Sequence, residues 1–159
     1  MATTNSAAIR DVMVTTIAAL TPVAPGGGRF VAHRLRGNDF REYCEQNPTF
    51  RLFSIRETGP LEGPEVSNLD NEWVTTTFEL VSCYPLSNRA GPQMSLDRDD
   101  AMELDMRQFD AAIGLVGFAA LEAAAFATVM GAPEREREQG QACAFNVLRV
   151  RIGYTRATT

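Results

Sequence analysis

The clearest alternation of hydrophobic and polar positions runs through residues 73–85, Trp-Val-Thr-Thr-Thr-Phe-Glu-Leu-Val-Ser-Cys-Tyr-Pro. Branched and aromatic side chains dominate this stretch and suit the pleated surface of a strand. Alternation predicts a core face made of Val74, Thr76, Phe78, Leu80 and Tyr84. The opposite face is mixed, with Trp73, Thr75, Thr77, Glu79, Val81 and Cys83. Pro85 has no amide hydrogen to donate, so the strand is expected to end there.

Three other segments have strand patterns. Residues 49–56 place Phe53 and Ile55 on one face, and we expect them to pair antiparallel with the 73–85 strand. Residues 29–36 alternate loosely and predict a short strand. Residues 143–154 alternate well and predict the last strand, after which residues 156–159 should fray.

Helical spacing predicts two amphipathic helices in the N-terminal third. Residues 7–20 carry one hydrophobic stripe, and Asn5 or Ser6 can cap their start. The stripe consists of Ile9, Val12, Met13, Ile17 and Leu20. Asn38 is predicted to cap a second, shorter helix that ends near Gln46 and buries Phe40 and Tyr43.

A long helix is predicted from about Leu96. Its buried stripe is Met102, Met106, Phe109, Ile113 and Val116. Asp97, Asp99 and Asp100 are expected in its first turn, where the helix dipole favours anions. Residues 118–130 are rich in alanine and predict a further helix, although Phe126, Thr128 and Met130 also alternate as in a strand.

The segments between these elements read as loops. Residues 22–28 and 58–71 are rich in glycine and proline, and residues 134–141, Glu-Arg-Glu-Arg-Glu-Gln-Gly-Gln, are expected to be a solvated loop or turn. Together the elements predict one α+β domain over residues 1–159. Its mixed or antiparallel sheet would be flanked by an N-terminal helix and a long helix in the C-terminal half.

Composition excludes several functional classes. The chain has 159 residues and a net charge of −5, which argues against a general nucleic-acid binder. It contains no lysine, so neither a Schiff-base lysine nor a phosphate-loop lysine is possible. The N-terminal residues do not form a signal peptide, and no apolar run is long enough for a membrane span.

The candidate chemical groups all have simpler structural interpretations. His33 and Cys44 could form a nucleophile pair, but no motif surrounds them and no third group orients them. The three cysteines, Cys44, Cys83 and Cys143, match neither a disulfide framework nor a zinc spacing and are expected to be reduced. The acidic group Asp97, Asp99, Asp100, Glu103 and Asp105 lacks a calcium-loop spacing. We therefore predict no enzyme activity and no catalytic, cofactor-binding or metal-binding residue.

The order of elements resembles one known family. Ile9-Arg10-Asp11-Val12 opens the first helix, Tyr84-Pro85 closes the central strand, and the helix containing Asp97 to Ile113 follows. This arrangement resembles the tail terminator (tail completion) proteins of long-tailed bacteriophages, although residues 118–130 depart from it. The resemblance implies a structural virion subunit, made in the host cytoplasm, that forms a hexameric ring.

Such a ring would cap the tail tube and join it to the head–neck connector protein, while DNA passes through its channel without specific binding. An acidic wall suits that passage because it repels phosphate. The 58–71 loop is expected to become ordered against a neighbouring subunit or tail protein, or to line the channel. Two alternatives remain: another neck or head-completion ring protein, and a soluble ligand-binding module that uses the apolar face of the 73–85 strand.

Overall fold

The computed structural model describes residues 4–24, 26, 28–59, 71–86, 92–113 and 134–157. Within this part, three helices and one five-stranded mixed sheet confirm the predicted α+β class. In chain order the elements are α1 (Ser6–Ala19), β1 (Val31–Ala32), α2 (Gly37–Gln46), β2 (Leu52–Glu57), β3 (Asn71–Pro85), α3 (Pro92–Ala111), β4 (Glu134–Gln139) and β5 (Cys143–Ala157).

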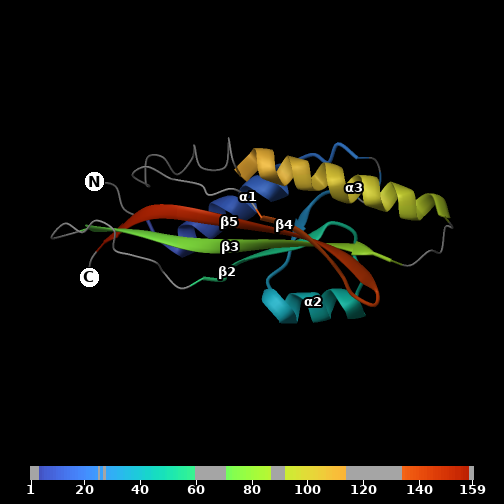
Figure 1. The fold of residues 1–159 in the computed structure, drawn as a ribbon, viewed down its shortest axis with the longest axis horizontal. Coiled ribbons are helices and arrows are strands. Elements are labelled where there is room, and N and C mark those ends of the chain that lie inside the picture. Colours follow the sequence, from blue (N-terminus) through green and yellow to red (C-terminus); the bar gives the residue numbers. More distant parts are fainter. Residues whose placement is uncertain are drawn as a thin grey trace.

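A two-stranded ribbon made of β3 and β5 forms the axis of the sheet (Figure 1). Each strand has 15 residues, and they pair antiparallel over their whole length, from Asn71 opposite Ala157 to Pro85 opposite Cys143. The full strand order is β1-β2-β3-β5-β4. Pairing of β2 with β3 is antiparallel, and β3 ends at Pro85, so both of these expectations are confirmed.

The two faces of the sheet are covered unequally. Helices α1 and α3 lie on one face and α2 lies on the other (Figure 1). The main core fills the first face, and its central strands contribute Val74, Phe78, Leu80, Leu148, Val150, Ile152 and Tyr154. A second cluster lies beneath α2, with Phe40, Cys44, Leu52, Val81, Cys83, Cys143, Phe145 and Val147. The C-terminal half of β3 is therefore buried on both faces, which explains why its polar alternation weakens there.

The first two helices begin differently. Asn5 caps α1 as predicted, because its Oδ1 accepts a hydrogen bond from the Ala8 amide at 2.8 Å. The predicted Asn38 cap of α2 is wrong: the helix begins at Gly37, and Arg36 occupies the cap position without a side-chain hydrogen bond. Gly37 has a φ of 62° and lies against the Arg56 guanidinium, where a Cβ would collide. Helix α2 therefore begins without a capping side chain, at a glycine whose positive φ other residues rarely adopt.

Helix α3 begins earlier than the sequence pattern indicated. It starts at Pro92, so Asp97, Asp99 and Asp100 lie beyond its first turn, and the prediction that they occupy that turn is wrong. Proline is well tolerated at a helix start because its missing N–H would have no partner there. The expected core positions Met102, Met106, Phe109 and Ile113 are buried. Val116 and residues 118–130 lie outside the described residues, as does most of the 58–71 loop.

Two expectations about loop structure are wrong. Residues 134–139 form strand β4 rather than a solvated loop, pairing antiparallel with β5. The backbone ladder accounts for this outcome, since an edge strand can leave its charged side chains in water. The expected fraying at Arg156 is also incorrect, because β5 continues to Ala157 and Arg156 forms an ion pair with Glu72.

A buried polar network connects the elements on the α3 side. Arg51 and Asp105 are both fully buried, with Arg51 Nε 2.7 Å from Asp105 Oδ2. The Tyr84 hydroxyl donates to the same carboxylate oxygen at 2.7 Å. The Arg51 guanidinium also donates to the carbonyl oxygens of Ala24, Gly26 and Gly28. Charge-assisted hydrogen bonds in this network hold the segment that precedes β1 against three elements: the start of β2, the end of β3, and α3.

Replacing Phe78 with alanine tests the main core. Phe78 is buried in the cluster beneath α1 and α3, so Phe78→Ala should lower the free energy of unfolding by roughly 3–5 kcal/mol. Thr77→Ala, on the opposite face of the same strand, should cost less than about 1 kcal/mol. Denaturant unfolding measures both values, and a Phe78→Ala loss no larger than the control would contradict this packing.

Alkaline unfolding tests the polar network. Burial, followed by the charge of Asp105, raises the pKa of Tyr84 well above its ordinary value of 10. The folded state holds this proton more tightly, so the stabilisation is complete below about pH 10 and is lost as the pH rises through the folded pKa. The denaturant midpoint for unfolding of the wild type should therefore decrease as the pH is raised beyond about 10. Tyr84→Phe should be less stable at neutral pH but show a shallower alkaline slope; equal slopes would contradict the network.

Candidate functional site around helix α2

A shared carboxylate organises the sheet surface beside α2. Glu79, on β3, is 3% exposed, and arginines from three different elements surround it. Arg56 of β2, Arg149 of β5 and Arg41 of α2 approach its oxygens at 3.1, 3.2 and 3.4 Å, respectively. A carboxylate has enough acceptor positions for several guanidinium groups, so one buried acid balances charge from three elements.

Strand β4 extends this network with exposed glutamates. Glu138 accepts a hydrogen bond from Arg41 Nε at 2.9 Å, and Glu136 pairs with Arg149. The hydrogen bond to Glu136 raises the pKa of Arg149 more than burial lowers it. The arginines are therefore held as fixed cations between an inner and an outer row of carboxylates.

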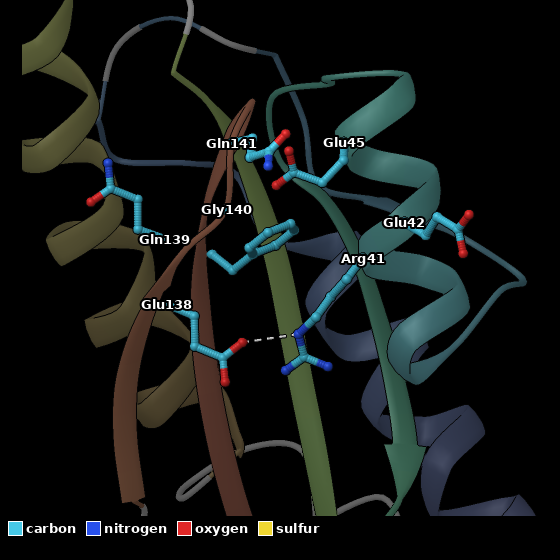
Figure 2. A pocket seen from close by; sticks show the side chains of 8 residues that line it. Arg41, Glu42, Glu45, Glu138, Gln139, Gly140 and Gln141 are labelled. Carbon is cyan, nitrogen blue, oxygen red and sulfur yellow. Dashed lines mark hydrogen bonds and ion pairs between the residues drawn. The ribbon is translucent and has the colours of Figure 1, made fainter.

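A hollow of about 370 Å³ lies between α2 and the turn that joins β4 to β5. Figure 2 shows Arg41 and Glu138 pointing toward each other across it, with Glu45 placed near Gly140 and Gln141. Glu45 Oε2 accepts a hydrogen bond from the Ala142 amide at 2.5 Å, while its buried Oε1 has no hydrogen-bond partner among the described residues. Glu45 therefore fastens the turn to α2, with Phe145 also lining the hollow.

The three cysteines meet beneath the C-terminal end of α2. Cys83 and Cys143 place their sulfur atoms 3.1 Å apart, and Cys143 Sγ also donates to the Cys44 carbonyl oxygen at 3.3 Å. The hydrogen bond to Cys83 and burial raise the pKa of both Cys44 and Cys143, and these bonds lower that of Cys83. All three are free thiols and fully buried, so the cluster is closed to a substrate from solvent.

The structure does not unite His33 with Cys44 as a catalytic pair. The His33 ring stacks on Tyr43, with centroids 4.3 Å apart, and its Nδ1 accepts a hydrogen bond from the Leu35 amide. Cys44 instead faces the other two cysteines. Within the described residues no hydrogen bond joins His33 to Cys44, so the orientation required for nucleophilic activation is missing there.

The acidic group of α3 is also dispersed. Asp99, Asp100 and Glu103 are exposed, whereas Asp105 is buried against Arg51. Among the residues that the structure describes, no group of three or more histidine, cysteine, aspartate or glutamate side chains is arranged to hold a metal ion. The sequence interpretation of Asp105 as one more surface helix acid missed its role, because its partner Arg51 is 54 positions away.

The chain matches no protein-family model and no curated protein sequence. Among the helices of the described residues, none combines the length and apolar composition that crossing a membrane requires. The functional inference therefore depends on the arrangement of the chain's own residues. Around α2, these residues form a network of mutually paired charges over a closed thiol cluster, which is suited to holding a rigid surface.

Removing the shared charge tests this interpretation. Glu79→Gln preserves the shape of the side chain but deprives three arginines of their common carboxylate, so we expect a loss of roughly 1–3 kcal/mol in unfolding free energy. Glu138→Gln is the matched control, since this residue is more exposed and, within the described part of the chain, pairs with one arginine, Arg41. The control should cost less than about 1 kcal/mol. Equal losses would show that Glu79 does not organise the surface.

Proposed function

We propose that this chain is a structural virion protein, a tail terminator subunit that assembles into a hexameric ring. In this role the ring caps the tail tube of a long-tailed bacteriophage and joins it to the head–neck connector protein. The observation that carries the proposal is the order of elements around the β3–β5 ribbon: helix, short strand, short helix, two paired strands ending at Tyr84-Pro85, helix and two final paired strands.

Two structural features support an assembly role over a catalytic one. The titratable side chains around α2 are paired with one another, and the thiols are buried away from solvent. Within the described residues, the sheet has two different edge strands, β1 and β4, on opposite sides. A ring requires a repeated contact between two different surfaces of the same subunit, and two unlike edges meet this requirement.

The mass of the purified protein tests the proposal. Sedimentation velocity and native mass spectrometry should find an assembly of six chains, and electron microscopy should show rings with six-fold symmetry. The hexamer fraction should rise with protein concentration, as expected for a reversible association. A compact monomer throughout the micromolar range, also in the presence of isolated tails, would overturn the ring.

A soluble ligand-binding module is the second candidate. Helices α1 and α3 already cover the apolar face of β3, but an apolar hollow of about 610 Å³ lies between these helices. Its lining includes Ala19, Leu20 and Ala112, and its volume is within the range of ligand pockets. Saturable binding of an apolar fluorophore by a monomer, abolished in Ala112→Phe, would favour this candidate over the ring.

A further inference from the structure

The edge of the sheet at β1 carries a concentration of positive charge. Residues 29–36, Arg-Phe-Val-Ala-His-Arg-Leu-Arg, contain three arginines and no acid. Arg29, Arg34 and Arg36 are exposed, and none of them forms an ion pair within the described part of the chain. Val31 lies among them with 53% of its surface exposed. Exposed charge around an apolar side chain, on an open edge, is typical of a contact surface.

A small hollow accompanies this edge. It has a volume of about 240 Å³ and lies between α1 and the segment after β1, with His33, Arg34 and Arg36 in its lining. Arg10 and Asp11 also line it and pair with each other, so Arg34 and Arg36 carry its net positive charge. A carboxylate entering this hollow would meet guanidinium donors, which bind carboxylates in a bidentate manner.

The opposite edge of the same sheet carries complementary groups. Strand β4 alternates glutamates with Arg135 and Arg137, so the two arginines lie on one face. Its register with β5 places Glu136 and Glu138 together on the other face, opposite Val147 and Phe145. Both glutamates remain 40% or more exposed despite their pairs with Arg149 and Arg41. A carboxylate can accept further hydrogen bonds beside an existing pair, so this edge can receive additional arginines.

Strand directions also allow the two edges to meet. Strand β1 runs parallel to β2, and each later neighbour in the order β2-β3-β5-β4 is antiparallel to the one before it. Strands β1 and β4 therefore run in opposite directions. A second copy placed beside β4 in the same orientation would continue the sheet as an antiparallel pair, which needs no reversal of either subunit.

We propose that the arginine-bearing β1 edge of one subunit docks on the glutamate-bearing β4 edge of a second copy of this chain. The contact is heterologous: the β1 edge of each subunit binds the β4 edge of the next. The chain of subunits closes into a ring if the rotation between neighbours divides a full turn evenly. This inference rests on the proposed ring and names its interface. Main-chain hydrogen bonds supply part of the affinity, and the opposite charges select the correct edge.

A second copy fits this edge better than nucleic acid does. The whole chain has a net charge of −5, so the residues outside the arginine stretch carry the entire negative surplus. Long-range repulsion from that surplus opposes a polyanion, whereas a second copy brings its own acidic edge to the arginines. The β1 strand is also only two residues long, which limits indiscriminate strand addition and leaves selection to the charges.

Two charge-reversal variants test the proposal. Arg29→Glu/Arg34→Glu disables the β1 edge, and Glu136→Arg/Glu138→Arg disables the β4 edge. Each should raise the dissociation constant of assembly roughly a hundredfold or more, because like charges then face each other. Asp100→Arg, an exposed change on α3 at a residue outside the lining of the hollows beside both edges, is the control and should assemble as the wild type does. Unfolding midpoints confirm that every variant is folded.

Mixing the two variants gives the decisive measurement. Each variant alone presents like charges at the contact, but in an equimolar mixture the intact β1 and β4 edges can pair and the two reversed edges also carry opposite charges. The mixture should therefore assemble again, and native mass spectrometry should detect equal numbers of the two variants in each assembly. If the wild type and both variants all form rings, the edge contact is wrong but the proposed ring still holds. A monomeric wild type would overturn the ring. Unchanged assembly with loss of duplex DNA binding in Arg29→Glu/Arg34→Glu would reassign the edge to nucleic acid and contradict this proposal.

Discussion

The buried pair of Arg51 and Asp105 is the interaction on which the rest of the fold depends. Arg51 stands directly before β2 with a φ of 60°, and its guanidinium reaches α3 and the segment before β1. Phe30 and Phe50 place their rings 5.5 and 5.1 Å from the Arg51 guanidinium carbon. Two buried charges are costly to remove from water. Every available donor and acceptor around them must be used, and this requirement sets the relative positions of four chain segments.

Around α2, closer to the surface, charged side chains are again satisfied by partners from several different elements. Glu79 satisfies arginines from β2, β5 and α2, and the carboxylate of Glu45 holds the β4–β5 turn. Below them the three thiols fill a closed apolar layer with Phe40 and Phe145. Charges that pair with one another across three elements make this face rigid. A rigid face is what a repeated contact between identical subunits requires.

The ribbon of β3 and β5 connects these two regions to the sheet edges. Because it is paired along its full length, it fixes β2 and β1 on one side and β4 on the other. The two edges then differ: β1 is two residues long and flanked by arginines, while β4 is six residues long and presents glutamates on one face and arginines on the other. A sheet with unlike edges favours head-to-tail association, whereas two like edges would favour a closed dimer.

The sequence alone determined the elements whose side chains repeat with the period of the backbone. The faces of 73–85 and the stripe of Ile9, Met13 and Ile17 were predictable because burial on one side leaves a local pattern. Only the tertiary structure placed Arg51 against Asp105, gathered Cys44, Cys83 and Cys143, and grouped three arginines around Glu79. Those contacts join residues distant in the chain, and their register leaves no local periodicity. The same reason applies to β4: a neighbouring strand supplies its hydrogen bonds, so a charged segment that looks like a loop becomes a strand.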